Sequence, residues 1–333
     1  MKIAVDPNIP FITKPLVETL GAEVTHDLTP EGVRDADAII TRTRTKCDES
    51  LLGGSRVGFV GTATIGTDHI DLDYCRSAGI TVANAPGCNA PAVAQWVLAA
   101  VRETGGYEGR TLGVIGAGNV GSILIRWARA LGMDVLVNDP PLSLTAPDRY
   151  TYCSLDEIAD KADIVTVHTP LVREGRYPTY HLVGDDFINS LKRSPLVLNA
   201  ARGPVADTAA LLRGLDSGKI SAVGIDCWEG EPEINRSLLE KALFATPHIA
   251  GYSREGKIRA TQMVLDALSQ YLGLDKPLMA DADTILPVPE TVAPSDITYD
   301  ILADTRRLKE SPETFETQRN RYDLRHEPGQ STL

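Results

Sequence analysis

The chain has 333 residues and a formal net charge of −12 at pH 7. This length suggests two or three domains, each large enough to bury its own core. Hydrophobic residues make up 43% of the sequence and charged residues 23%, the usual mix of a soluble globular protein. The acidic balance argues against a nucleic-acid partner, because phosphate backbones need a basic face. It is compatible with a small anionic substrate held by a local group of Arg and Lys side chains.

Cysteine usage and the apolar segments indicate an intracellular environment. The five cysteines are scattered without a C-x-x-C spacing, which favours reduced thiols over a disulfide framework or a zinc site, so no metal is expected. The N-terminus runs directly into a strand-like segment at 2–6, without an apolar signal segment. No stretch approaches the roughly 20 apolar residues that span a bilayer. We therefore expect a cytoplasmic protein without a membrane partner.

The first part of the chain alternates short β-branched runs with helical or turn segments, a pattern typical of a parallel sheet. A long apolar run then predicts a buried helix over 89–103 that connects two domains. A helix over 254–272 is expected to return to the first domain. The predicted strands of this part are 2–6, 22–26, 37–41, 57–61 and 80–84.

A second α/β series begins at Thr111. Beyond Lys276, prolines punctuate a segment with little apolar periodicity, and a polar, charge-rich stretch follows it. The predicted strands of this series are 111–115, 134–138, 163–167, 195–199 and 220–225, and its predicted helices are 119–131, 154–160 and 207–217.

A glycine-rich turn joins the first strand and helix of the second series. The turn reads G-x-G-x-x-G, with Gly116, Gly118 and Gly121 at the fixed positions and Asn119 and Val120 between the last two. The first glycine permits the tight turn, the second lets a pyrophosphate approach the backbone, and the third lets the helix pack on the strand. The helix N-terminus offers free N–H groups to phosphates. The strand–turn–helix context favours a dinucleotide site over a ligand-free turn.

The next predicted strand identifies the dinucleotide. It leads to Asp139, 18 residues after Gly121. A carboxylate at this place accepts hydrogen bonds from the ribose hydroxyls of an adenosine and repels a 2′-phosphate. NAD is therefore favoured over NADP as the cofactor.

Three further residues have the chemistry of hydride transfer with a 2-hydroxy acid. Arg202 follows the strand-like run 196–201, at a strand end where its guanidinium can grip a carboxylate. His248 is the candidate acid/base, and Glu231 is positioned to fix its tautomer. Each residue also has a structural interpretation: Arg202 could form a surface ion pair, His248 could be a structural histidine, and Glu231 could be a solvated carboxylate. Their joint order after the cofactor turn favours the catalytic interpretation.

Together these residues resemble the D-2-hydroxyacid dehydrogenase family, in which the cofactor turn is followed by Arg, Glu and His. The similarity extends over residues 1 to about 275. The sequence Asp139-Pro140-Pro141 and the Tyr252 ending resemble one branch of this family in particular, whose substrate is a phosphorylated 2-hydroxy acid. The resemblance implies that Arg202 and Glu231 are active-site residues and that His248 is the proton donor. It also implies contacts to NAD from Asp139, Thr169, Asp226 and Gly251, and contacts to the substrate from Thr43, Thr64 and Tyr252.

With this resemblance, we predict an α/β fold in three parts. A doubly wound parallel-sheet (Rossmann) NAD domain is expected at 89–253, and a flavodoxin-like substrate or lid domain at 1–88 with 254–275. A shortened C-terminal segment is expected at 285–333, in which 299–325 resembles a remnant of a dimerisation domain. The family implies a homodimer, and from the shortened segment we expect its interface to be partial or altered.

A basic cluster after a predicted strand suggests a site for a phosphate group. In a strand-like extension, Arg42, Arg44 and Lys46 would share one face. We predict that Arg42, ahead of Arg44 or Lys46, helps to bind the phosphate of a small phosphorylated 2-hydroxy acid. A solvated basic loop is the alternative. Two other functions stay open: the same chemistry on glycerate or 3-phosphoglycerate, and an NAD-sensing module without catalysis.

Overall fold

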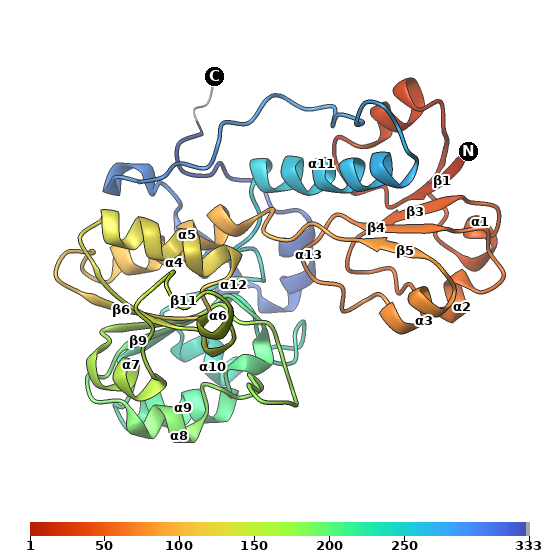
Figure 1. The fold of residues 1–333 in the computed structure, drawn as a ribbon. Helices are drawn as coiled ribbons and strands as arrows, with labels where there is room; N and C mark the ends of the chain where they lie inside the picture. The colour runs from red at the N-terminus through yellow and green to blue at the C-terminus, as the bar shows by residue number, and fades with distance from the viewer. Residues whose placement is uncertain (331–333) are drawn as a thin grey trace. The chain divides into compact units, whose positions relative to one another are not determined.

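The computed structural model describes residues 1–330, which form two compact units (Figure 1). Unit 1 comprises residues 1–89 and 253–286. Unit 2 comprises residues 90–252 and the chain from Pro287 onward. Unit 1 is therefore built from two segments that are separated in sequence by most of unit 2.

Unit 1 is a five-stranded parallel sheet with the strand order β2-β1-β3-β4-β5. This is the flavodoxin-like order, in which ligands bind at the carboxyl ends of the strands. Its strands are β1 (Lys2–Val5), β2 (Glu23–Thr25), β3 (Ala38–Thr41), β4 (Phe59–Thr62) and β5 (Thr81–Ala83). Its helical elements are η1 (Pro15–Thr19), α1 (Pro30–Val33), α2 (Glu49–Leu52), α3 (Leu72–Ser77) and α11 (Arg254–Tyr271).

The sheet of unit 1 is covered on both faces because successive strand residues point to opposite sides. On one face, Ile40 and Phe59 pack with Val264 and Leu268 of α11. On the other face, the neighbouring strand residues pack against α1, α2 and α3 through a second apolar cluster. The helix α11 lies along the sheet (Figure 1), so the last element of unit 1 in sequence closes one of its two cores.

Unit 2 contains a six-stranded parallel sheet in the order β11-β10-β9-β8-β6-β7. Beyond β7, Tyr152 forms a single parallel bridge with Val137. Counted with this bridge, the sheet has the 3-2-1-4-5-6 order of dinucleotide-binding folds plus a seventh strand. Its strands are β6 (Thr111–Ile115), β7 (Asp134–Asn138), β8 (Ile164–Val167), β9 (Leu196–Asn199), β10 (Ala222–Ile225) and β11 (Phe244–Ala245).

Helices cover both faces of this sheet, as Figure 1 shows. The cluster around Leu112 and Trp127 packs on the α4–α5 face, and the cluster around Val165 and Leu211 packs on the other face. The helical elements are α4 (Ala90–Glu103), α5 (Asn119–Ala130), α6 (Pro140–Thr145), α7 (Leu155–Lys161), α8 (Asp185–Ser190), η2 (Gly203–Val205), α9 (Thr208–Asp216), α10 (Arg236–Lys241), η3 (Pro294–Asp296), α12 (Ile301–Glu310), η4 (Pro312–Thr314) and α13 (Phe315–Asn320).

The C-terminal part of the described chain is integrated into unit 2. Tyr299 and Ile301 belong to the same cluster as α4, while Leu308 and Phe315 belong to the cluster on the opposite face. The Trp127 indole N–H donates to the Pro289 carbonyl at 2.9 Å. Residues 287–330 therefore form part of the core of unit 2 and do not stand as a separate body.

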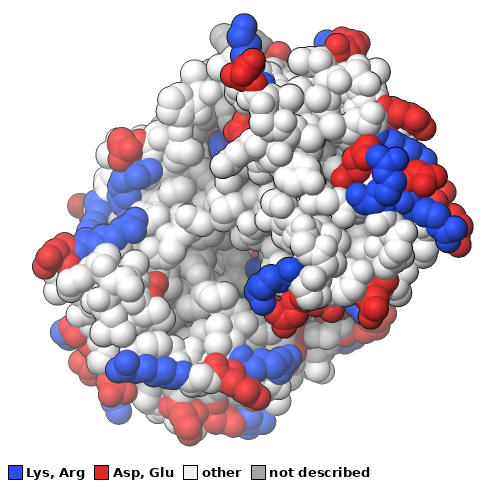
Figure 2. All heavy atoms as spheres, turned by 45° about the vertical axis from the view of Figure 1, so that its right-hand side comes forward, with Lys and Arg blue, Asp and Glu red and all other residues white. Residues whose placement is uncertain are grey.

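The surface carries charges of both signs. On the face drawn in Figure 2, positive and negative side chains alternate around its edge. Within residues 1–330, no helix combines the length and the apolarity needed to cross a membrane.

Candidate active site

The candidate residues of unit 2 follow consecutive strands at one edge of its sheet. The glycine turn follows β6, Asp139 follows β7 and Thr169 follows β8. Arg202 comes after β9, and His248 comes after β11. Because all six strands are parallel, their carboxyl ends meet at the same edge, where ligands bind in this class of fold.

The glycine turn is shaped to hold a dinucleotide. Gly116 has φ +96°, and a Cβ there would lie 2.8 Å from the His168 carbonyl. A Cβ on Gly121 would overlap the Gly116 carbonyl oxygen, so the helix approaches the strand too closely for any other residue. Among the described residues, nothing lies within 4 Å of a Cβ built on Gly118. The turn is closed on its inner side and open at the second glycine, which is where a pyrophosphate approaches.

The residues beside the turn fit a bound NAD. The Thr169 hydroxyl is buried and has no hydrogen-bond partner within residues 1–330, so it is available to a ligand. Asp139 accepts from the Ala117 N–H at 2.8 Å and from the Leu142 N–H at 2.9 Å. This carboxylate links the end of β7 to the turn and caps α6, and its remaining lone pairs can still accept from ribose hydroxyls.

His168 lies at the end of β8 and is uncharged. Burial lowers the pKa of this imidazole to about 3. One ring nitrogen lies 3.0 Å from the Thr166 hydroxyl, and the other has no partner within the described chain. The cofactor edge therefore has a neutral histidine whose protonation state is fixed across physiological pH.

His248 and Glu231 form the central contact of the site. The His248 Nδ1 lies 2.6 Å from the Glu231 Oε1, and about a quarter of each side chain is exposed. The second carboxylate oxygen of Glu231 accepts from the Trp228 N–H at 3.2 Å. A carboxylate at Nδ1 places the proton on that nitrogen, which leaves Nε2 to exchange a proton with a substrate.

The Glu231 carboxyl stays ionised despite its position. Burial alone would raise its pKa. The opposing effects together outweigh burial and lower the pKa: the hydrogen bond and charge of His248, the Trp228 N–H and the charge of Arg319. An ionised Glu231 stabilises a protonated His248 during turnover. The pair therefore has the geometry and charge of an acid/base unit.

A buried network beneath His248 holds the residue in place. His248 has φ +56°, a strained backbone conformation for a residue other than glycine. The Asp226 carboxylate accepts from the Thr246 hydroxyl at 2.6 Å and from the Ile249 N–H at 2.8 Å. Thr246 in turn accepts from the Trp96 indole N–H at 3.0 Å. Burial raises the pKa of Asp226, so its ionised form depends on these donors.

The turn that carries Arg202 is fixed by Asn199. The buried Asn199 amide donates to the Arg202 carbonyl at 3.0 Å and accepts from the Ala201 N–H at 3.1 Å. A Cβ on Gly203 would overlap the Trp228 carbonyl oxygen. The turn that carries Arg202 and the loop that carries Glu231 thus touch backbone to backbone. Neither Asn199 nor Gly203 was expected from the sequence: the bonds of Asn199 follow from the geometry of its own turn, and the close neighbour of Gly203 comes from the loop after β10.

The remaining candidates of unit 2 lie just after His248. Gly251 and Tyr252 are partly exposed, and the Tyr252 hydroxyl accepts from the Arg319 Nε at 3.3 Å. Sequence analysis did not single out Arg319. Arg319 lies in α13, and α11 and α12 separate it in sequence from the catalytic motifs, so no motif near it pointed to the site.

Unit 1 brings Thr43 and Thr64 to the carboxyl edge of its own sheet, after the paired strands β3 and β4. Thr43 is exposed in the turn after β3. The Thr64 hydroxyl lies 2.7 Å from the Thr62 hydroxyl and donates to the Gly66 carbonyl at 3.1 Å. These positions suit contacts to a substrate in that fold.

The structure corrects the geometry expected for the basic cluster. The strand ends at Thr41, and the next residues form a turn, so the alternation that would align three cations does not apply. The Arg42 Nε contacts the nearly buried Asp6 carboxylate at 3.2 Å. Lys46 pairs instead with Asp48 at 2.7 Å. Of the three cations, Arg42 lies nearest to the end of the strand, but it already has an anionic partner.

One group with the chemistry of metal ligands occurs within the described residues, and its Glu229 belongs to the same loop as Glu231. It comprises His181, Asp207 and Glu229. The carboxylates are already engaged, because Asp207 caps α9 and Glu229 accepts from the Thr208 N–H. The His181 Nε2 lies 2.6 Å from Glu229. These contacts describe a structural cross-link between three loops.

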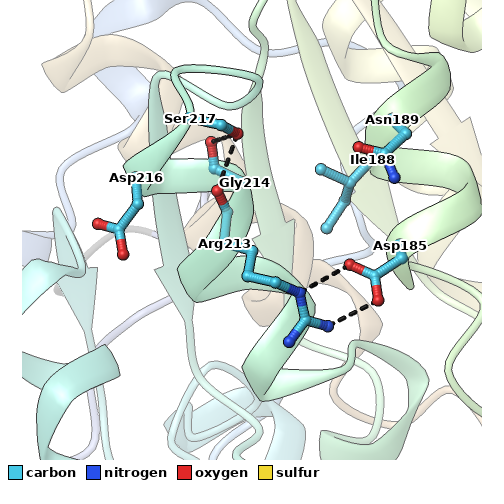
Figure 3. A pocket seen from close by; sticks show the side chains of 7 residues that line it. All are labelled: Asp185, Ile188, Asn189, Arg213, Gly214, Asp216 and Ser217. Carbon is cyan, nitrogen blue, oxygen red and sulfur yellow. Dashed lines mark hydrogen bonds and ion pairs between the residues drawn. The ribbon is translucent and has the colours of Figure 1, made fainter.

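A surface hollow on unit 2 is lined by none of the candidate residues. It lies between α8 and α9, and an ion pair joins the two helices there (Figure 3). Arg213 donates to Asp185 from Nε at 3.0 Å and from a terminal nitrogen at 2.6 Å. Both side chains are more than half exposed, so this contact contributes little to stability.

Comparison with known proteins identifies the family of this chain. The profile of the D-isomer specific 2-hydroxyacid dehydrogenase NAD-binding domain matches residues 92–250. The erythronate-4-phosphate dehydrogenase of Bacteroides fragilis is 46% identical over 346 aligned residues, covering 99% of this chain and 98% of that protein. The Escherichia coli enzyme of the same name is 44% identical, covering 87% of this chain and 78% of its own length.

A solved structure extends the comparison to the fold. The D-lactate dehydrogenase of Aquifex aeolicus, determined with NAD and lactic acid, has a TM-score of 0.66 at 26% identity. The match covers 83% of this chain and 96% of that one. The chain belongs to the erythronate-4-phosphate dehydrogenases, within the family of D-isomer specific 2-hydroxyacid dehydrogenases.

Proposed function

We propose that this chain oxidises the C2 hydroxyl of 4-phospho-D-erythronate to 2-oxo-3-hydroxy-4-phosphobutanoate, a step of vitamin B6 biosynthesis. The single observation that carries the chemistry is the 2.6 Å contact between His248 and Glu231 at the carboxyl edge of the dinucleotide-binding sheet. The substrate comes from the similarity to erythronate-4-phosphate dehydrogenases over nearly the whole chain.

The protein residues supply three functions in this reaction. His248 accepts the proton of the C2 hydroxyl at Nε2, while Glu231 stabilises the imidazolium that forms. Arg202 binds the substrate carboxylate and polarises the neighbouring carbon–oxygen bond. NAD, when bound, accepts the hydride from C2. In the reverse direction His248 returns the proton.

Further residues would hold the cofactor and the substrate. Gly116, Gly118 and Gly121, with the N–H groups of Asn119 and Val120, would hold the pyrophosphate. Asp139, Thr169, Asp226 and Gly251 are proposed as the other contacts to NAD. Thr43, Thr64 and Tyr252 are proposed as contacts to the substrate, and Arg42 as a contact to its phosphate.

The decisive experiment measures NADH formation at 340 nm with 4-phospho-D-erythronate, glycerate and 3-phosphoglycerate. We expect a clear preference in kcat/KM for phosphoerythronate. The variant His248→Asn should lower kcat by roughly 10² to 10⁴-fold, the usual contribution of general acid–base catalysis. His26→Asn is the matched control, because His26 is exposed in unit 1, and its kcat should not change.

The same experiment separates the alternatives. A preference for glycerate or 3-phosphoglycerate would keep the chemistry but replace the substrate. Binding of NADH without turnover of any 2-hydroxy acid would indicate an NAD-sensing module. We further propose that the chain works in the cytoplasm as a homodimer, and a monomer in sedimentation would reject the dimer.

A further inference from the structure

Arg319 is a mostly buried cation that contacts Tyr252, four residues after the candidate base His248, and the proposed mechanism gives it no role. It lies in α13, and only 18% of its side chain is exposed. Its Nε donates to the Tyr252 hydroxyl at 3.3 Å. The nearest carboxylate, that of Glu316, is 3.8 Å from a terminal nitrogen. A guanidinium at this depth needs nearby negative charge to offset the loss of water.

Besides Glu316, groups of the active site supply negative charge to Arg319. Burial lowers the pKa of Arg319, but its interactions with Tyr252, Glu231 and Cys227 outweigh burial and raise it. In return, the charge of Arg319 contributes to the lowered pKa of Glu231. The titratable groups that interact with Arg319 or with Glu231 include Cys227, His248, Tyr252 and Glu316. The charge of Arg202 in addition lowers the pKa of Cys227.

A second arginine from the same segment fixes the loop that Arg319 contacts. One terminal nitrogen of Arg325 donates to the carbonyls of Ile249 and Tyr252, both at 3.1 Å. The other donates to the carbonyls of Ala92, at 3.1 Å, and Ala250. Arg325 therefore ties the main chain directly after His248 to the N-terminal turn of α4.

We propose that Arg319 is a positioning residue of the active site, which α13 supplies to hold the Tyr252 hydroxyl and to balance the negative charge of Glu231. Arg319 acts through these two groups and not on the reacting atoms. The catalytic part of this inference rests on the proposed function. The C-terminal segment is thereby part of the active site and not only a covering of the core.

The test measures the titration of Glu231 directly, so that it needs no turnover. The carboxyl carbon of Glu231 is followed by ¹³C NMR, with the Glu231→Gln spectrum as the assignment. In Arg319→Gln, the pKa of Glu231 should rise by on the order of half a unit, because a nearby cation is lost. Arg319→Lys keeps the positive charge, so the pKa of Glu231 in this variant should be close to its value in the unsubstituted protein. Arg321→Gln removes an exposed arginine just after α13 and should leave the titration unchanged.

The kinetic readout uses the same variants. The acidic limb of kcat/KM should move to higher pH in Arg319→Gln and stay near its original position in Arg319→Lys. If Arg319→Gln fails to bind NADH, it is replaced by Arg319→Met, whose side chain has a similar length and no amide group. An unchanged Glu231 titration in a folded Arg319 variant, or an equal shift in Arg321→Gln, would overturn the inference. Failure of the proposed substrate would leave the NMR result intact.

Discussion

The two units have parallel sheets of similar design, but they fix their candidate residues in different ways. In unit 2, the turn of Arg202 and the loop of His248 are held by the buried side chains of Asn199 and Asp226. In unit 1, Thr43 is exposed in a turn, and Arg42 is held by a single ion pair. The groups proposed for proton transfer are thus rigidly placed, whereas those proposed to recognise the substrate sit on a more open edge. Changes in unit 2 should affect kcat most, and changes in unit 1 should affect KM.

Among changes outside the proton-transfer pair itself, the largest effect is expected from Gly203→Ala. The added methyl group would overlap the Trp228 carbonyl and lie 2.7 Å from the Glu229 nitrogen, so one backbone must move. This separates the turn of Arg202 from the loop of Glu231, and kcat should fall by about 100-fold, since small misplacements are costly in catalysis. Gly224→Ala is the control, because its methyl group meets only the side chains of Leu198 and Phe244. Equal losses of kcat in both variants would show that general destabilisation is responsible.

Asp226→Ala should have the next largest effect. It leaves the Thr246 hydroxyl and the Ile249 N–H without their acceptor in a buried place, which costs about 1 to 3 kcal/mol of stability. Because His248 then loses its support, kcat should also fall, by about tenfold. Thermal unfolding and steady-state kinetics measure both effects. Asp226→Asn keeps one acceptor oxygen and should lose less, and a rise in the KM for NAD would support the proposed cofactor contact.

Acid should weaken unit 2 through Glu231. Its pKa in the folded protein is below the ordinary value of 4.5, so its contribution to stability is present above about 4.5 and is lost as the pH falls through the folded pKa. The slope attributable to this residue is at most about 1.4 kcal/mol per pH unit. Glu231→Gln should flatten the pH dependence of the unfolding free energy below pH 4.5, whereas the exposed Glu233→Gln should not. The pKa of Asp226 is raised in the folded protein, so its ionised form destabilises the fold, and this destabilisation is lost as the pH falls.

The smallest effect, and the sharpest test of unit 1, is expected from Arg42→Ala. If Arg42 binds the substrate phosphate, the KM for phosphoerythronate should rise by about tenfold with little change in kcat, which corresponds to about 1.4 kcal/mol of binding. Arg44→Ala, in the exposed part of the turn, is the comparison variant. An equal rise in KM for an unphosphorylated 2-hydroxy acid would remove the phosphate role and leave Arg42 as the partner of Asp6.

The ten strands expected from the sequence are all present, with ends shifted by at most two residues. Short β-branched runs identify such strands because both faces of a parallel sheet are buried. The sequence did not reveal β11, since Phe244–Ala245 is too short to show a period. It also did not show that the polar segment around α12 packs into unit 2, where only a few spaced residues such as Leu308 and Phe315 enter the core.

The sequence predicts those members of the candidate site whose residue type is tied to one chemical task. The glycine turn, Arg202, Glu231 and His248 follow from local motifs and their order. The supporting roles do not: Asp226 was expected only as an NAD contact, and Asp226 and Arg319 acquire their supporting roles from Thr246 and Tyr252, which only the folded chain brings near. An isolated asparagine or arginine in a sequence gives no signal of the hydrogen bonds it will make.

The two-segment construction of unit 1 has a consequence for its synthesis. The strands β1 to β5 leave the ribosome first, but α11, which covers Phe59 and its neighbours, is made about 190 residues later. At the usual rates of translation this delay is roughly 10 to 40 seconds. Throughout this interval the nascent sheet presents an uncovered apolar face, so it depends on chaperones or on slow collapse to avoid aggregation. Slower elongation lengthens this interval, so it should raise the fraction of nascent chains that is lost to aggregation.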